Sequence, residues 1–268
     1  MLACGLHSYF FLIAHILIAI IAWTTSQFTK HPAHQNMSRP ENATGARADK
    51  FYNTSEATSY SQSNRLRRVQ LSLGKRSLDL LQLPAGPCFL LDIGCGTGLS
   101  GVPLSRAGHT WIGTDISTSM LEVAEKERGA RGTDVMTSDM GHGLPFRDDI
   151  FDGAISVSAI QWLCYESKSH KRSPTERLRK FFKTLRRQLK PGGRAVLQFY
   201  PEQTEDATAI RDAAIYCGFT GGVVVDYPGD LNAKKFYLVI EGLPRGAGGV
   251  QGGNGGGGSS GGAKRPKR

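Results

Sequence analysis

Cysteine is scarce in this sequence, and its distribution excludes two classes of small, cross-linked domain. The chain has 268 residues and five cysteines, and no two of them form a C-x-x-C pair. An odd and scattered set of thiols provides no disulfide framework and gives no indication of a zinc site. We therefore expect the chain to work in a reducing compartment. The five are Cys4, Cys88, Cys95, Cys164 and Cys217.

Long apolar runs are also scarce. The run Tyr9–Trp23 has 15 residues and is interrupted by His15, whereas a helix needs ~20 apolar residues to span a bilayer. It resembles the apolar region of a secretory signal or a marginal anchor. However, no Lys or Arg precedes it, and the first basic residue is Lys30, so the basic region of such a signal is missing. We do not expect the protein to bind membranes.

Acidic residues are outnumbered, with 23 Asp and Glu against 33 Lys and Arg, which gives a net charge of +10. Much of the excess lies between Lys168 and Lys190, where ten basic residues accompany one acidic residue, Glu176. A basic stretch of this kind is typical of a surface that binds a polyanion. The alternative interpretation is a solvated helix face with no partner.

Glycine, by contrast, is abundant, and several glycines follow an apolar run directly. Phe89–Ile93 predicts a buried parallel strand, and Gly94, Gly96 and Gly98 come immediately after it. Glycines let the backbone turn sharply and approach a ligand closely. Together with Gly101 they also contain the G-x-G-x-x-G spacing of dinucleotide-binding loops, but displaced along the chain from the strand end.

Two carboxylates decide between the ligands that such a loop binds. Asp92, at the end of the strand, would repel the pyrophosphate of a dinucleotide, but it suits the ammonium and sulfonium groups of S-adenosylmethionine. Asp115 lies about twenty residues further on, where a carboxylate accepts hydrogen bonds from ribose hydroxyls. We interpret the pair as part of an S-adenosylmethionine site. The alternative is that both residues only cap turns and helices.

Strand and helix patterns alternate along the chain. This alternation predicts an α/β fold with a doubly wound, mostly parallel seven-stranded sheet and helices on both faces. We expect one helix to be interrupted near Gly74, and Pro191-Gly192-Gly193 to end another. The expected strands are 89–93, 109–115, 134–140, 150–157, 195–199, 222–226 and 236–240, and the expected helices are 64–83, 118–129, 174–190 and 204–217.

Several motifs resemble those of methyltransferases. Leu91–Gly98, Asp115 and Leu189–Gly193 are similar to the motifs of Rossmann-like class I methyltransferases. Other motifs narrow the resemblance to the eukaryotic 18S rRNA (guanine-N7) methyltransferases, over about Met37–Ile240. These are Ser38–Glu41, Phe51–Tyr52, Gly98–Gly101, Ser158–Leu163, Tyr200–Glu202, Val225–Pro228 and Ala233–Leu238.

The resemblance implies a function and a set of partners. It implies S-adenosylmethionine-dependent methylation of a guanine N7 in 18S rRNA, within pre-40S particles, in the nucleus (nucleolus and nucleoplasm) and cytoplasm. It also implies a heterodimer with a small zinc-binding activator subunit shared by several methyltransferases. We place that subunit on the expected edge strand at Asp134–Ser138, since exposed edges invite strand addition. A small-molecule methyltransferase and a non-catalytic ribosome-assembly scaffold stay open as alternatives.

Candidate site residues follow from the strand ends. We expect the cofactor to be bound by glycines that admit its methionine portion, by Asp115 on the ribose, by Ile116 and Asp139 on the adenine, and by Met140 as a backbone donor or apolar wall. Phe51, Tyr52 and Tyr60 are expected to fold over this pocket. The predicted cofactor set is Asp92, Gly94, Gly96, Gly98, Asp115, Ile116, Asp139 and Met140.

A guanine pocket is expected beside the cofactor, after the fourth and fifth strands. An aromatic side chain there would hold the unstacked base at about 1–3 kcal/mol. Core packing for Trp162 and helix capping for Gln161 and Ser158 are the alternatives. We assign no catalytic acid or base, because guanine N7 carries a lone pair and no proton. The candidates are Ser158, Gln161, Trp162, Tyr200 and Pro201.

The ends of the chain differ from the family pattern. Family members begin close to Met37, so we interpret residues 1–36 as translated upstream sequence, with an anchor or targeting extension as the alternative. Residues 37–63 are expected to be a loop segment and residues 64–242 the methyltransferase domain. Residues 243–268 are expected to form a disordered glycine-rich tail that ends in the basic cluster Lys264–Arg268.

Overall fold

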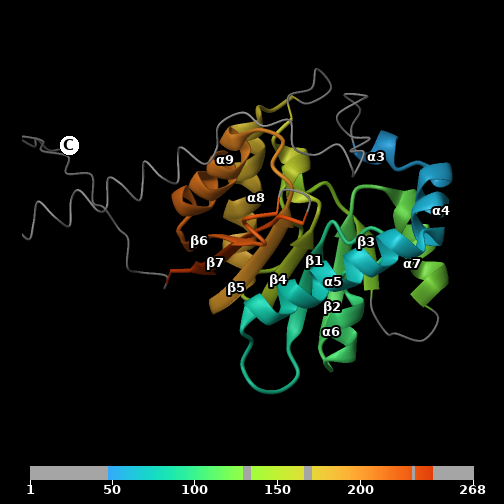
Figure 1. The fold of residues 1–268 in the computed structure, drawn as a ribbon. Helices are drawn as coiled ribbons and strands as arrows, with labels where there is room; N and C mark the ends of the chain where they lie inside the picture. Colours follow the sequence, from blue (N-terminus) through green and yellow to red (C-terminus); the bar gives the residue numbers. More distant parts are fainter. Residues whose placement is uncertain (1–47, 129–133, 166–170, 231–232, 244–268) are drawn as a thin grey trace, which may run out of the picture.

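A twisted sheet forms the centre of the molecule in the computed structural model, which describes residues 48–128, 134–165, 171–230 and 233–243 (Figure 1). In this part of the chain the sheet has seven strands in the order β3-β2-β1-β4-β5-β7-β6. All neighbours are parallel except β7, which runs antiparallel to β5 and β6. The predicted mostly parallel seven-stranded sheet is confirmed. The strands are β1 Phe89–Ile93, β2 Thr110–Asp115, β3 Asp134–Thr137, β4 Phe151–Val157, β5 Leu189–Phe199, β6 Phe219–Asp226 and β7 Lys235–Gly242.

The strand order places β1 at the switch point of the sheet. Leu91 lies opposite Ile112 of β2 on one side and opposite Ala154 of β4 on the other. The chain leaves β1 toward β2 and later returns to its other side, so a crevice opens at the carboxyl ends of these strands. This edge is where the sequence places the glycine loop and the carboxylates.

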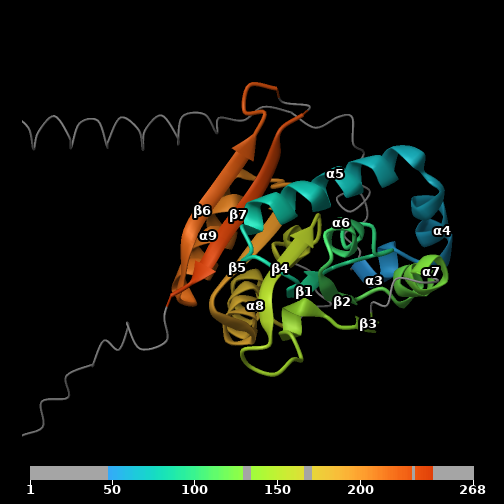
Figure 2. The ribbon, with the colours of Figure 1, turned by 90° about the horizontal axis from the view of Figure 1, so that it is seen from below.

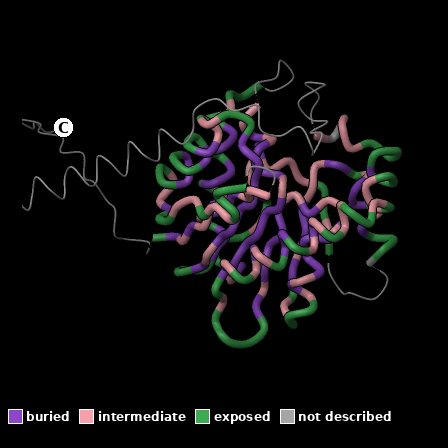
Figure 3. The backbone as a smooth tube through the Cα atoms, in the orientation of Figure 1, coloured by how far each residue is buried: buried purple, intermediate pink, exposed green. Residues whose placement is uncertain are grey.

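Helices cover both faces of the sheet, as predicted (Figure 2). Alternate strand residues point to opposite faces, so Leu90 packs with Leu73 and Trp111 on one face while Leu91 packs with Phe181 on the other. Burial on both faces explains the continuous apolar strands (Figure 3). One layer holds α5 Asn64–Leu81, α6 Val102–Arg106 and α7 Thr118–Arg128, and the other holds α8 Pro174–Gln188 and α9 Thr204–Tyr216.

The expected interruption at Gly74 is wrong, because α5 runs unbroken from Asn64 to Leu81. Gly74 is buried in the middle of the helix, where a Cβ atom would lie 2.6 Å from the backbone oxygen of Ser100. The glycine therefore marks a close approach between α5 and the segment before α6 rather than a helix break.

The segment expected to be a loop contains two helices, α3 Ala48–Phe51 and α4 Thr54–Gln62. Asn53 caps α4, since its side chain accepts hydrogen bonds from the amides of Ser55 and Glu56. This local cap outweighs the polar composition that predicts a loop. Residues 1–47 and 244–268, on which the predictions about both ends of the chain fall, lie outside the described residues.

β5 is longer than expected, and α8 before it ends at Gln188, so the expectation that Pro191-Gly192-Gly193 ends this helix is wrong. The predicted capping box at Ser173 and Glu176 opens α8, but the strand begins at Leu189 rather than Ala195, and its pairing with β4 is irregular between Leu189 and Arg194. A positive φ of 75° at Gly192 lets the chain bulge there without leaving the sheet. None of the described helices has the length and apolarity to cross a bilayer.

Candidate active site

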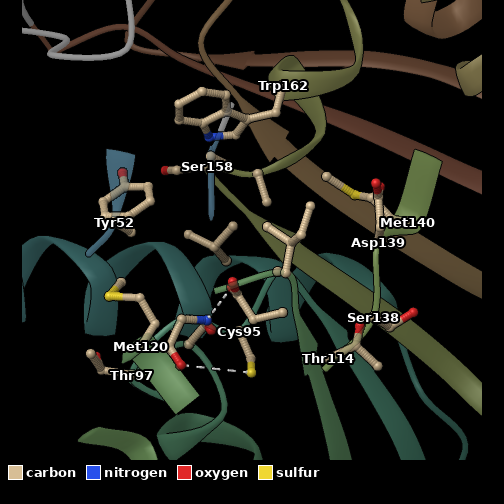
Figure 4. A pocket seen from close by; sticks show the side chains of 18 of the residues that line it. Tyr52, Cys95, Thr97, Thr114, Met120, Ser138, Asp139, Met140, Ser158 and Trp162 are labelled. Atoms are coloured by element: carbon tan, nitrogen blue, oxygen red, sulfur yellow. Dashed lines mark hydrogen bonds between the residues drawn. The ribbon is translucent and has the colours of Figure 1, made fainter. Parts of the chain in front are cut away.

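A pocket opens at the carboxyl ends of β1, β2 and β4 and reaches the helices α3, α4 and α5 (Figure 4). Eight of the predicted site residues line it, and they come from four separate loops. Trp162 and Tyr52 lie across the pocket from Cys95 and Thr97 (Figure 4). The eight are Gly94, Gly96, Asp115, Ile116, Asp139, Met140, Ser158 and Trp162.

The glycine loop forms the floor of the pocket with its backbone. Gly94 and Gly96 have φ angles of +69° and +52°, which residues other than glycine rarely adopt. A Cβ at Gly94 would lie 2.3 Å from the Cβ of Ala159. Gly98 also has a positive φ of +80°, but it packs toward Trp111 and does not line the pocket.

Asp115 joins the loop to the end of β2. One carboxylate oxygen accepts a hydrogen bond from the Gly96 amide and the other from the Ser117 amide, both at 2.8 Å. Each oxygen has a second lone pair, so the half-buried carboxylate keeps capacity for ligand hydroxyls. Burial raises its pKa above the usual range, while the backbone amides of Ser117, Gly96 and Ile116 oppose that shift.

Asp92 lies underneath the glycine loop, fully buried, and does not line the pocket. One oxygen accepts a hydrogen bond of 2.7 Å from the Ser100 hydroxyl, and the other has no hydrogen-bond partner in the described part of the chain. Burial raises the pKa of Asp92 to about 7, opposed by Ser100 and assisted by the charge of Asp115. An unsatisfied buried carboxylate beneath the loop fits a cationic ligand above it better than an anionic one.

The side of the pocket opposite Tyr52 is formed by the segment after β3 (Figure 4). Asp139 caps the short helix η1 Met140–His142, and its two oxygens lie 2.8 Å from the Gly141 amide and 3.0 Å from Nδ1 of His142. The carboxylate is therefore held in a fixed orientation in the same pocket as Met140 and Ile116.

Aromatic rings gather at the mouth of the pocket. The ring centroid of Trp162 lies 6.2 Å from Tyr52, 6.3 Å from Phe51 and 6.1 Å from Tyr165. Tyr52 and Tyr60 line the pocket, as the sequence predicts, whereas Phe51 only supports Trp162. The backbone oxygen of Tyr52 accepts a 2.7 Å hydrogen bond from Ser117, which ties this segment to the end of β2.

The remaining guanine-pocket candidates do not line the pocket. Gln161 is buried in the short helix η2 Ile160–Leu163 and donates to the backbone oxygen of Ser158 at 3.0 Å, so its role here is to hold the loop. Tyr200 and Pro201 are buried as well, and the Tyr200 ring faces Lys235, whose Nζ lies 5.5 Å from the ring centroid. Ser158, which does line the pocket, has a φ of +57° and donates to Oε1 of Gln198 at 2.8 Å.

Arg177 of α8 lines the pocket, although the sequence alone marks it only as one of ten basic residues in the stretch Lys168–Lys190. It is buried and donates to the backbone oxygens of Trp162 and Tyr165. The helical spacing contains the signal, because Arg177 precedes Phe181 by four residues and so falls on the apolar stripe of α8. It holds the segment that carries Trp162.

These observations define a class of protein. The molecule has three features of a class I methyltransferase. They are a doubly wound sheet with β7 antiparallel, a glycine loop after β1 and a carboxylate at the end of β2. The residues fit its cofactor, S-adenosyl-L-methionine, through the fixed Asp115 carboxylate and the unsatisfied buried oxygen of Asp92. Residues 91–197 also match the family model described as a methyltransferase domain.

Comparison with curated proteins identifies the family. The chain is 47% identical over 206 residues to a probable 18S rRNA (guanine-N(7))-methyltransferase of Dictyostelium discoideum, covering 76% of this chain and 70% of that protein. It is 48% identical to the 18S rRNA (guanine-N(7))-methyltransferase of Mus musculus, with coverage of 73% and 71%. The chain belongs to the family of 18S rRNA (guanine-N7)-methyltransferases.

Solved structures of lower identity share the fold. A TehB-like SAM-dependent methyltransferase from Corynebacterium glutamicum matches with a TM-score of 0.51 and 20% identity, over 71% of this chain and all 100% of that one. The putative methyltransferase in a complex with the Haloferax volcanii Trm112 methyltransferase activator matches with a TM-score of 0.50 and 18% identity, over 70% and 98%. At these identities the similarity concerns the fold alone.

Proposed function

We propose that this protein transfers the methyl group of S-adenosyl-L-methionine to N7 of a guanine in 18S rRNA during maturation of the 40S subunit. The observation that carries the proposal is the extended identity with curated enzymes of that name, 47% over 206 residues in one case. The pocket supports it, because a cofactor site and an aromatic ring suited to a base open into the same space.

The chain's own residues would bind and orient the cofactor, which supplies an electrophilic methyl group. We assign the ribose to Asp115 and the exocyclic amine of the adenine to Asp139, with Ile116 and Met140 on the ring. The backbone of Gly94 and Gly96 leaves room for the methionine portion. Asp92 acts from below the loop by stabilising positive charge.

The chemistry needs positioning rather than proton transfer. Guanine N7 attacks with a lone pair that carries no proton, so no general base is required. Trp162, half-buried and supported by Tyr52, Phe51 and Tyr165, is placed to stack on the flipped-out base. Holding the base in line with the methyl group supplies part of the rate, since orientation is worth roughly 7–11 kcal/mol at best.

We also propose that a small zinc-binding activator subunit pairs with β3. This strand forms one edge of the sheet, and Met136 on it is 37% exposed. The Ser138 amide donates to Asp115 of β2. Because strand amides alternate in direction, that of Thr137 points to the free side, where a partner strand can add. A methyltransferase of this fold occurs in a complex with a Trm112 activator.

The proposed site of action follows from the proposed substrate. An enzyme that modifies 18S rRNA during subunit maturation would be found in the nucleus, in nucleolus and nucleoplasm, and in the cytoplasm. A fluorescent fusion of the full chain that co-localises with a nucleolar marker would support this assignment. Exclusive membrane association would contradict it.

The experiment that tests the function measures N7-methylguanosine in 18S rRNA by mass spectrometry. Cells that lack their own enzyme would receive either the full chain or its Asp115→Ala variant. We expect the wild type alone to restore the modification. Normal growth with Asp115→Ala but without methylation would instead indicate a scaffold. Growth and a methylated metabolite without modified rRNA would indicate a small-molecule enzyme.

A further inference from the structure

A second hollow lies between α5 and the β6–β7 hairpin, outside the cofactor pocket. Its helix side presents Arg68, Lys75 and Arg76, and its hairpin side presents Tyr227 and Lys235. The hairpin side is formed by residues of two segments singled out in the sequence, Val225–Pro228 and Ala233–Leu238, and none of these residues lines the cofactor pocket.

The hollow carries excess positive charge. Asp226 accepts two hydrogen bonds from Arg76, at 2.9 and 3.0 Å, and Asp79 lies 3.6 Å from Lys75. These pairs match the two carboxylates of the hollow with two of its four cations, so the charges of Arg68 and Lys235 are not balanced by a carboxylate of the hollow. The Lys235 ammonium donates to the backbone oxygens of Ala233, at 2.9 Å, and of Lys234, and it keeps its charge beside the hollow. A surface of this sign suits a polyanion and repels the basic end of the chain itself, Lys264–Arg268.

Tyr227 stands at the rim of the hollow. It is 66% exposed, and its φ of +53° lies in the left-handed region, which is costly for a bulky side chain. Core packing does not repay this cost, because the ring is on the surface. An exposed aromatic face is a platform on which an unpaired base stacks, whatever its sequence.

The hollow adjoins the cofactor pocket. Gln70 of α5 lines the pocket, while Val69 and Leu73 line the hollow, so less than one helical turn, ~5.4 Å, separates them along the axis. Phe236 at the start of β7 pairs with Phe199 at the end of β5. The hairpin therefore lies at the same edge of the sheet as the crevice.

We infer that this hollow binds the single-stranded rRNA nucleotides next to the target guanine, with a base stacked on Tyr227 and phosphates beside Arg68 and Lys235. The inference rests on the proposed function and adds a second contact region for the same substrate. It makes Tyr227 a determinant of RNA affinity that does not touch the cofactor.

The test uses the full chain, purified together with the co-expressed activator subunit, and radiolabelled 18S rRNA made by in vitro transcription. RNA affinity is measured by filter binding, methylation of the same RNA by transfer of labelled methyl groups, and cofactor affinity by calorimetry. Tyr227→Ala is compared with Tyr216→Ala, which removes a tyrosine of similar exposure, 69% against 66%, outside the hollow. Arg68→Glu is compared with Lys126→Glu on the exposed side of α7.

We expect Tyr227→Ala to weaken RNA binding about five- to tenfold, as the loss of one stacked base implies, and Tyr227→Phe to bind like the wild type. Arg68→Glu should weaken binding and reduce its salt dependence, with cofactor affinity unchanged in every variant. Equal RNA affinities for Tyr227→Ala and Tyr216→Ala would overturn the inference. A wild type that binds this RNA in a Tyr227-dependent way but never methylates it would refute the proposed function and leave the inference standing.

Discussion

At the residue scale, the buried Asp92 makes the stability of the protein without cofactor depend on pH. Its folded-state pKa of about 7 lies above the ordinary pKa of 3.8 for an aspartate in the unfolded chain, so between these pH values the folded state binds a proton that the unfolded state has released. Stability contributed by this group is therefore complete below pH ~4 and is lost as pH rises through ~7, on the order of 4 kcal/mol.

Replacing Asp92 by Asn removes that titration. We expect the free energy of unfolding of Asp92→Asn, relative to wild type, to rise as the pH increases from 4 to 7 and then to level off. Urea denaturation of both proteins across this range measures the difference. Parallel curves for the two proteins would show that Asp92 is ionised in the folded state throughout.

Single residues also show what the sequence can and cannot predict. Asp115, Ile116 and Asp139 were predictable as pocket residues because each lies at, or within two residues of, the end of a strand that must face the crevice. Gln161 and Tyr200 also lie near strand ends, but their side chains turn into the protein. That choice is made by packing partners distant in sequence, such as Lys235 for Tyr200.

At the scale of elements, replacing Gly74 of α5 by alanine would raise the helix propensity but worsen the packing of the helix. Gly→Ala in a helix interior should gain about 0.5–1 kcal/mol from propensity. Here, however, the new Cβ would lie 2.6 Å from the Ser100 backbone oxygen, a contact that only a backbone shift relieves. Overpacking of this kind costs about 1–3 kcal/mol, so we expect Gly74→Ala to destabilise the protein.

Thermal and urea denaturation check the sign. Gly229→Ala is the matched control, since nothing lies within 4 Å of a Cβ at Gly229 and its stability should stay within about 0.5 kcal/mol of wild type. A more stable Gly74→Ala protein would mean that α5 can move away from Ser100. The same contact explains the incorrect prediction of a helix break, because a long-range packing constraint is not visible in local sequence.

The edge strand β3 gives a prediction about the activator. Thr137→Pro removes the backbone N–H of residue 137, which points to the free side of β3. The hydrogen bond from the Ser138 amide to β2 stays in place. We expect the variant to fold but to lose co-purification with the activator subunit on co-expression. Thr137→Val keeps the amide and should keep the partner. Equal recovery of the activator with both variants would place its binding surface elsewhere.

At the scale of the whole molecule, the mostly parallel sheet and its two helical layers were predictable from the alternation of strands and helices along the sequence. The strand order and the wall of the pocket formed by α3 and α4 were not. Those two helices are short and polar, and they are held by contacts such as Tyr52 with Ser117 and Tyr52 with Trp162. Such contacts exist only once the sheet has formed, so no local sequence pattern predicts them.

The net charge of +10 favours RNA binding by the exposed basic face of α8. On α8, Arg177 is buried and Arg187 pairs with Asp148, while Lys180 and Lys183 are exposed. If this face contacts phosphates, each contact adds about 0.9 to the slope of log affinity against log salt for a duplex and about 0.7 for a single strand.

Lys180→Glu combined with Lys183→Glu should therefore weaken binding of 18S rRNA and reduce the salt slope by one to two, about as much as two lost phosphate contacts. Filter binding at several salt concentrations measures the slope, with Lys126→Glu on α7 as a control for charge reversal at one exposed lysine elsewhere. The exposed position of both lysines means that folding stability should stay within about 0.5 kcal/mol of wild type. An unchanged slope would identify the exposed face of α8 as solvated surface and leave RNA binding to the crevice and the hollow beside it.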